Sequence, residues 1–246
     1  MSTNVVTYES HEHIAVITMN RPEKHNALNG EIEEGLHQAW LRFRDSDDRV
    51  AILTGAGQKA FTAGADLYSP PEIWRFTPGV GVELEKPVIA AVNGVCVGGG
   101  VVLVQFADLC VAAEHAVFSY PEAKVALCGG LISSVAARIP HKLAMEMILL
   151  GEKITAQRAY EFGLVNKVVP QTELMAAAMG YARTLADNAP LVLSLLKRFV
   201  GRVLPKGPSE LAGIGRRDVA VVMSSQDAEE GKASFREKRK PVYVGR

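Results

Sequence analysis

The most constraining feature of this sequence is a change in its hydrophobic pattern near residue 170. Before that point, short apolar runs separated by turn residues predict strands at 5–8, 14–19, 50–54, 88–92, 109–113, 116–118 and 165–169. Helices are predicted at 29–43, from 98–100 onward, and from Thr155 to near Gly163. Beyond residue 170 the periodicity is helical throughout, at 174–186, 191–200, 209–222 and 225–240. The pattern predicts an α/β core in residues 1–170 and a helical region in residues 171–246.

Charge and cysteine content exclude several classes of protein. The chain balances 27 basic against 27 acidic residues, so no field of one sign favours nucleic acid or an anionic membrane. The N-terminal residues lack a secretory pattern, and no apolar run reaches the ~18 residues of a membrane span. Cys96, Cys110 and Cys128 lack metal-binding spacing and suit reduced thiols. We expect a cytoplasmic protein with a small-molecule partner and no metal.

Two glycine-rich segments match familiar motifs without the context that those motifs require. Residues 55–60, GAGQKA, fit the GxGxx(G/A) dinucleotide pattern, but the prolines at 70–71 leave no room for the helix that a pyrophosphate needs. Residues 94–98, GVCVG, fit a nucleophile elbow around Cys96. Such a triad needs a histidine well downstream, whereas the last histidine is His141. We therefore expect no dinucleotide, and a small buried role for Cys96.

A third arrangement uses two glycine segments together. The loop at 64–66 and the glycines at 98–100, which follow a strand and open a helix, each place a free backbone N–H at a bend. Two such donors aimed at one carbonyl oxygen form an oxyanion hole, to which the helix dipole adds positive potential. The alternative is that these glycines serve only close packing of the helix.

Many segments, in one order along the chain, resemble the enoyl-CoA hydratase/isomerase (crotonase) family. The first are NRPEKHNALN at 20–29, AFTAGAD at 60–66, KPVIAAVNG at 86–94, GGG at 98–100 and Pro121-Glu122. The resemblance continues through AMEMILLG at 144–151, ITAQ at 154–157, GLV at 163–165, Glu230-Gly231 and FREKR at 235–239. It extends over nearly the whole chain, and several motifs in family order are more specific than any one of them.

The resemblance implies a fold and a substrate class. The fold would be an α/β crotonase-like spiral of ββα units, with a helical C-terminal region that mediates trimerisation and commonly forms a dimer of trimers. The substrate would be an acyl-CoA thioester, so coenzyme A would enter as part of the substrate and no separate cofactor is expected. The oxyanion-hole donors would be the N–H groups of Ala65 and Gly99.

The resemblance also implies a set of residues that bind the substrate or its coenzyme A. Lys24 would meet the nucleotide end of coenzyme A, while Phe235 and Lys238 would reach the coenzyme A of a neighbouring subunit. A cation near phosphate is physically sensible. The remaining positions of this set are Ala63, Asp66 and Gly130.

The catalytic position implied by the resemblance is Glu122, the second of two glutamates that hold a water in family hydratases. Pro121 is expected to fix it at the end of a strand. The first position is Val102, which cannot ionise or orient water. Family isomerases are similar to this chain in keeping one glutamate. We therefore expect Glu122 to move a proton between carbons through an enolate, unless it is only a surface carboxylate.

The acyl group and the reaction stay open at this stage. Ala126 stands where the family usually has glycine, and the pocket-forming segment 67–85 is short. Trp74 and Phe76 either line the acyl pocket or anchor the loop. Hydratase and lyase activities are alternatives to isomerisation, and hydration stays open if another carboxylate reaches the water, for example Glu72, Glu83 or Glu85. An acyl-CoA-binding homologue with little or no catalysis is the alternative from a different class.

Overall fold

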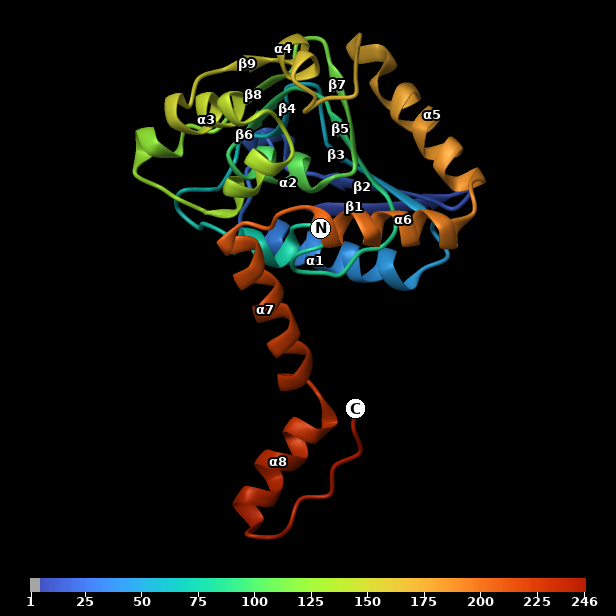
Figure 1. Cartoon of the computed structure of the whole chain (residues 1–246), viewed down its shortest axis with the longest axis vertical. Helices are drawn as coiled ribbons and strands as arrows, with labels where there is room; N and C mark the ends of the chain where they lie inside the picture. Colours follow the sequence, from blue (N-terminus) through green and yellow to red (C-terminus); the bar gives the residue numbers. More distant parts are fainter. Residues whose placement is uncertain (1–4) are drawn as a thin grey trace.

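The computed structural model describes residues 5–246, which form an α/β body and a helical extension (Figure 1). The larger of two sheets has the strand order β1-β2-β3-β5-β7-β10. Its strands are β1 Val6–His11, β2 Ile14–Met19, β3 Val50–Gly55, β5 Val88–Val92, β7 Leu109–Ala113 and β10 Lys167–Val169. Only β1 runs antiparallel to its neighbour, so the interior of this sheet is parallel and its strands are apolar on both faces.

A smaller sheet with the order β4-β6-β8-β9 lies beside the first. Its strands are β4 Ala60–Thr62, β6 Val95–Val97, β8 Val117–Ser119 and β9 Ile154–Thr155. The chain passes three times from the large sheet to the small one, through β3 and β4, β5 and β6, and β7 and β8. Each passage adds parallel strands next to those of the previous passage. This repetition confirms the predicted spiral of ββα units.

Helices and short 3-10 turns connect and cover the strands. The helices are α1 Gly30–Asp45, α2 Gly99–Phe106, α3 His141–Leu150, α4 Ala156–Glu161, α5 Leu174–Asp187, α6 Pro190–Val203, α7 Pro208–Met223 and α8 Gln226–Glu237. The 3-10 turns are η1 Pro22–Lys24, η2 Ile73–Phe76, η3 Glu122–Val125, η4 Leu131–Ala137 and η5 Gln171–Glu173. Asn29 caps α1 by accepting a hydrogen bond from the N–H of Ile32, as its residue type predicts.

Helix α5 belongs to the packed body although it lies beyond residue 170. Its small and apolar residues recur at helical spacing and are buried against the large sheet: Leu174, Ala178, Ala182 and Ala186. Figure 1 shows this helix, coloured orange, beside the strands of the large sheet. The stripe of alanines lets the helix approach the sheet closely, so α5 packs on the body as part of its core.

The structure adds elements that sequence periodicity missed. Strands β4, β6 and β9 have only two or three residues, too few for an alternating pattern, and the apolar run of α3 was not predicted as a helix. Cys96 is buried in β6, as expected. The GAGQKA segment leads into β4 and not into a helix. The last helix ends at Glu237 because Lys238 is left-handed, with φ 53°.

The C-terminal helices expose an unusually apolar surface. Helix α6 contributes no buried residue, and α7 and α8 extend away from the body (Figure 1). The exposed apolar side chains of this region include Leu191, Leu196, Phe199, Val203, Val219, Val222, Met223, Phe235, Val242 and Tyr243. Exposed apolar side chains in this number usually mark an interface. None of the helices in residues 5–246 has the length and apolar character needed to cross a membrane.

Candidate active site

Glu122 lies three residues beyond β8 and begins the 3-10 turn η3, so the expectation that it ends a strand is wrong in detail. Its carboxylate lies against the glycine turn before α2. A Cβ built on Gly98 would lie 2.4 Å from Oε1 of Glu122. The other oxygen, Oε2, is buried and has no hydrogen-bond partner among residues 5–246. The carboxylate therefore faces the start of α2 with one oxygen available.

Burial raises the pKa of Glu122 to about 7, because the charged form loses hydration that no neighbouring cation replaces. A carboxylate with a pKa near neutral can both take and return a proton at physiological pH. The surface-carboxylate interpretation of Glu122 does not explain a half-buried, unpaired oxygen.

This pKa predicts a pH profile. If Glu122 acts as a base, only its ionised form is active, so kcat/KM should reach half its maximum at about pH 7 and fall roughly tenfold for each pH unit below that. If Glu122 had an ordinary pKa, kcat/KM would not change between pH 6 and pH 8. Initial rates over pH 5 to 9, with wild-type stability checked at each pH, distinguish the two. A flat profile would contradict the assignment.

Two backbone N–H groups near Glu122 are free. The N–H of Gly99 opens α2 and donates to no atom of the described residues, as a helix N-terminus allows. The N–H of Ala65 is also without an acceptor in the described part of the chain, although its neighbours are bonded. The N–H of Leu28 donates to the carbonyl of Gly64 at 2.8 Å, and that of Asp66 donates to the carbonyl of Leu28 at 2.7 Å.

Leu28 brings these two N–H groups to one place. Its backbone is clamped between residues 64 and 66, and a Cβ built on Gly99 would lie 2.8 Å from Leu28 Cδ1. A Cβ on Gly64, which has φ +92°, would lie 3.1 Å from the carbonyl oxygen of Val97. The loop of Ala65 thus packs directly on the turn of Gly99, and the arrangement is suited to an oxyanion hole.

Close packing also explains one of the three glycines. A Cβ on Gly100 would lie 2.5 Å from Thr62 Cγ2 and 3.1 Å from the sulfur of Cys96. The packing alternative is therefore correct for Gly100, whereas Gly98 leaves room for the carboxylate of Glu122.

The loop that carries Leu28 is held by a buried amide. Asn26 is fully buried, accepts a hydrogen bond from the N–H of Arg21, and donates to the carbonyls of Ala56 and Ala60. These bonds join the 20–29 loop to the start of β4, so the position of Leu28 is fixed from both sides. The sequence assigned no individual role to Asn26 or Leu28, although both lie in the family motif at 20–29.

A family model described as Enoyl-CoA hydratase/isomerase matches residues 9–71 and 81–246. The chain belongs to the enoyl-CoA hydratase/isomerase, or crotonase, family. A carnitinyl-CoA dehydratase of Salmonella typhi is 39% identical over 252 residues, with 95% of both chains covered.

Solved structures of crotonase-family proteins share the whole fold. A carnitinyl-CoA dehydratase from Mycobacterium avium 104 has a TM-score of 0.77 at 35% identity, covering 99% of this chain and 100% of that one. An enoyl-CoA hydratase/isomerase from Pseudoalteromonas atlantica T6c also has a TM-score of 0.77, at 29% identity, covering 98% of this chain and 100% of that one.

Within residues 5–246, the three glutamates that could compensate for Val102 have other surroundings. This valine is 3% exposed and lies inside α2. Among the described residues, none with a carboxylate side chain perturbs the pKa of Glu122. Glu83 and Glu85 line a different cavity, and Glu72 contacts Trp74 and Arg216. Glu122 is the carboxylate that lies against the glycine turn before α2.

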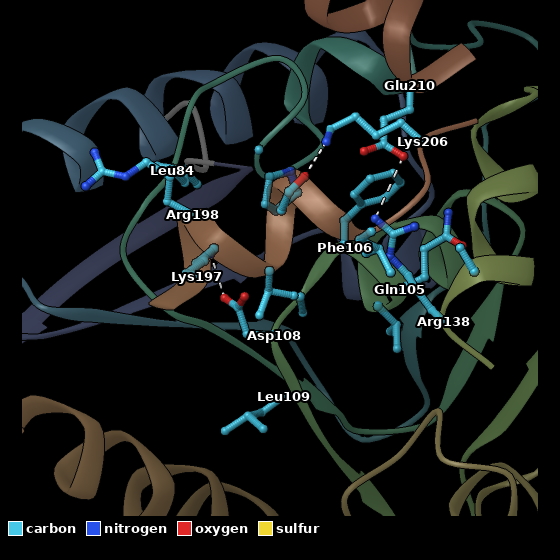
Figure 2. A pocket seen from close by; sticks show the side chains of 18 of the residues that line it. Leu84, Gln105, Phe106, Asp108, Leu109, Arg138, Lys197, Arg198, Lys206 and Glu210 are labelled. Carbon is cyan, nitrogen blue, oxygen red and sulfur yellow. Dashed lines mark hydrogen bonds and ion pairs between the residues drawn. The ribbon is translucent and has the colours of Figure 1, made fainter. Parts of the chain in front are cut away.

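The large cavity that holds Glu83 and Glu85 has a volume of about 830 Å³ and lies between α6, the start of α7 and the end of α2. Figure 2 shows Lys197 pointing toward Asp108 and Arg138 toward Glu210. These pairs join the helical region to the body, with N···O distances of 2.7 Å and 3.8 Å respectively. Glu122, Gly98 and Gly99 do not line it.

The coenzyme A positions implied by the family fall into two groups. Lys24, Ala63 and Asp66 lie together, because the N–H of Ala63 donates to the carbonyl of His25. Lys24 is exposed, and Asp66 lies 3.9 Å from Arg21. Phe235 and Lys238 are on and just after α8, away from the body of the same chain (Figure 1).

Gly130 lies apart from both groups of predicted coenzyme A positions. It begins η4 with φ +71°, and a Cβ at this position would lie 2.1 Å from the hydroxyl of Ser209 in α7. The structure therefore gives Gly130 a packing role between η4 and α7, in addition to the binding role that the resemblance implies.

The two aromatic residues of the variable segment have different roles. Phe76 is fully buried, and its carbonyl accepts a hydrogen bond from the indole N–H of Trp40. It anchors the loop. Trp74 is partly exposed and lines a cavity of about 350 Å³ with Ile73, whose Cδ1 contacts Gly99. Ile73 links this cavity to Gly99, whereas Ala65, Gly99 and Glu122 do not line it.

Proposed function

We propose that this protein acts on an acyl-CoA or enoyl-CoA thioester, with Ala65 and Gly99 as the oxyanion hole and Glu122 as the single acid and base. The unpaired, buried Oε2 of Glu122 beside the glycine turn carries the proposal. The free N–H groups of Ala65 and Gly99 support it, because they lie on two segments that Leu28 holds together.

In this mechanism the thioester carbonyl oxygen accepts hydrogen bonds from both N–H groups. Glu122 removes a proton from a carbon next to the thioester or conjugated with it, and the negative charge moves onto the carbonyl oxygen as an enolate. Preorganised donors of this kind stabilise the developing charge by about 3 kcal/mol each. The protonated Glu122 then returns the proton to another carbon, which is isomerisation. One carboxylate suffices, because it alternates between base and acid.

A second reaction is favoured by the similarity to carnitinyl-CoA dehydratases. In dehydration, Glu122 would remove the α-proton of a 3-hydroxyacyl thioester and return it to the departing β-oxygen, so that water leaves and the carboxylate is restored. This route also uses one carboxylate, and it does not require the carboxylate that Val102 lacks. An acyl-CoA-binding protein without chemistry is the remaining alternative.

We propose a homotrimer, or a dimer of trimers, as the working form, in the cytoplasm. The exposed apolar side chains of α6, α7 and α8 support assembly, and the distance of Phe235 and Lys238 from their own body in Figure 1 is compatible with a role at a neighbouring subunit. In this arrangement residues 1–170 form the core that binds the acyl-CoA, and residues 171–246 complete the coenzyme A site.

The test is proton exchange. The protein is incubated in deuterated buffer with a 3-enoyl-CoA, crotonyl-CoA and a 3-hydroxyacyl-CoA, and products are followed by absorbance and mass spectrometry. Deuterium at carbon with bond migration indicates isomerisation; loss or gain of water indicates a lyase. The Val102→Glu variant should gain hydration of crotonyl-CoA if the valine withholds a water-binding group. Thioester binding without bond migration, without deuterium exchange and without loss or gain of water would reject catalysis.

A further inference from the structure

The large cavity between α6, α7 and the end of α2 contains buried polar groups that the proposed chemistry does not use. Its volume of about 830 Å³ is in the range that holds a small organic molecule. The candidate oxyanion-hole residues and the candidate catalytic glutamate do not line it. Figure 2 shows Gln105, Phe106, Arg138 and Glu210 grouped at one end of this cavity. An occupant of that end would be separate from the thioester.

Arg138 is a buried cation with incomplete pairing. Its side chain is 16% exposed, and its guanidinium carbon lies 4.5 Å from the centroid of the Phe106 ring. One nitrogen donates to the carbonyl of Ser134 at 2.8 Å, but the other lies 3.8 Å from Oε2 of Glu210, too far for a hydrogen bond. That oxygen instead accepts from the hydroxyl of Ser134 at 2.6 Å. Burial lowers the pKa of Arg138 more than the charge of Glu210 raises it. A second anion would therefore stabilise the guanidinium.

Gln105 supplies an unused acceptor beside this cation. The residue is 5% exposed, and its Nε2 donates to the carbonyl of Leu131 at 2.8 Å. Its Oε1 is buried and has no hydrogen-bond partner in the described part of the chain. An unpaired buried carbonyl oxygen costs free energy, which a donor would recover. Because the last torsion of a glutamine is broad, a small rotation of the amide turns this oxygen toward the cavity that Gln105 lines.

The free groups of Arg138 and Gln105 are held close together by η4. They bond to the carbonyls of Ser134 and Leu131, which are three residues apart in this 3-10 helix. Three residues of a 3-10 helix rise about 6 Å. The guanidinium also stacks on Phe106, the residue next to Gln105. One small ligand group that both accepts and donates hydrogen bonds can therefore reach both side chains.

The rest of the lining indicates the charge and the character of the ligand. Six arginine and lysine residues line the cavity, against four aspartate and glutamate residues. This excess of positive charge favours an anion over a zwitterion or a cation. Between the charged side chains the wall is apolar, with Val104, Ile139, Leu164, Leu204 and Ile214. The cavity is thus suited to an anion with an apolar chain.

We propose that this cavity binds an α-hydroxycarboxylate with an apolar chain. The carboxylate accepts hydrogen bonds from Arg138, the hydroxyl on the adjacent carbon donates to Oε1 of Gln105, and the chain lies against Ile139 and Leu204. A hydroxyl next to a carboxylate places a donor and an acceptor side by side, as the two protein groups require. The proposal goes beyond the proposed function and does not depend on it, since the ligand is not a thioester.

Calorimetry on the assembled protein with three matched ligands tests the proposal. They are 2-hydroxyoctanoate, 2-methyloctanoate, in which a methyl group replaces the hydroxyl, and 2-hydroxyoctanamide, which lacks the charge. Wild type should bind 2-hydroxyoctanoate about fivefold more tightly than 2-methyloctanoate, the effect of one hydrogen bond to a buried group. It should bind 2-hydroxyoctanoate at least about tenfold more tightly than the amide, because a hydrogen bond between charged groups is stronger.

Two variants locate the ligand. Arg138→Lys keeps the charge but lacks the planar guanidinium, so the affinity for 2-hydroxyoctanoate should fall about tenfold. Urea unfolding checks that this variant is folded, and the three ligands on the wild type decide the proposal even if it is not. Arg158→Gln is the matched control. It removes an exposed ion pair with Glu161, at 3.6 Å, and Arg158 does not line the cavity. It should leave all three affinities unchanged.

Several outcomes would overturn the proposal. Equal binding of 2-hydroxyoctanoate and 2-methyloctanoate would remove the role of Gln105, and full affinity in a folded Arg138→Lys would remove that of Arg138. Binding of none of the three ligands, as when a neighbouring subunit fills the cavity, would remove the site. Displacement of 2-hydroxyoctanoate by octanoyl-CoA would place the acid in the thioester site. A preference for the hydroxy acid that octanoyl-CoA leaves unchanged, and that Arg138→Lys abolishes, is the expected result.

Discussion

Replacing Glu122 by Gln should lower kcat by about 10² to 10⁴ on whichever thioester the wild type converts. The amide keeps the size of the side chain and its place against Gly98, but it cannot accept the proton. KM should change little, because the thioester is held by Ala65, Gly99 and the coenzyme A contacts. The measurement is steady-state turnover, with deuterium exchange at the α-carbon as a second readout. Wild-type rates in this variant would reject Glu122 as the acid and base.

The same variant carries its own folding control. Burial raises the pKa of Glu122 from 4.5 to about 7, so the folded protein binds this proton more tightly than the unfolded chain does. The stability due to this proton is complete below about pH 4.5 and is lost as the pH rises through 7. Glu122→Gln should therefore be more stable than wild type at pH 8, by about 1 kcal/mol after screening by solvent, and nearly equal at pH 5. Urea unfolding at both pH values checks this.

The parts of the fold that could be predicted are those in which one strand or helix carries its own pattern. The β-branched runs at 14–19 and 88–92 are strands with those bounds, because a strand buried on both faces is apolar throughout. The three-residue strands β4 and β6 have no such pattern. They exist because each pairs with a neighbouring turn of the spiral, which is a property of the repeat and not of the local sequence.

In the candidate site, too, some residues could be predicted from the sequence and others could be found only in the structure. The resemblance pointed to Glu122, Ala65 and Gly99, and the structure brings the segments of all three together. Their relation depends on Leu28, to which the motif at 20–29 gives no role of its own, because its side chain contacts one segment and its backbone bonds to another. The sequence could not distinguish the role of Trp74 from that of Phe76 either. Their roles depend on contacts from α7 and α1, which lie far away in sequence.

Gly98 is the position where a single methyl group should do the most harm without unfolding the protein. In Gly98→Ala the new Cβ would lie 2.4 Å from Oε1 of Glu122. The far end of a flexible side chain yields more easily than a backbone, so the carboxylate moves and α2 stays. Displacing a reacting group by about 1 Å costs roughly 10² in rate. We expect kcat to fall by about that factor while coenzyme A thioesters still bind.

Backbone strain must be separated from this displacement, because Gly98 has φ +54°, a conformation that costs an alanine about 1 to 3 kcal/mol. Gly163→Ala is the matched control. Its φ is +85°, and a Cβ there would meet no atom within 4 Å. Both variants should lose stability in urea, but only Gly98→Ala should lose turnover. Equal rates in the two would mean that the carboxylate of Glu122 does not need its place against Gly98, and the single-carboxylate mechanism would lose its geometric basis.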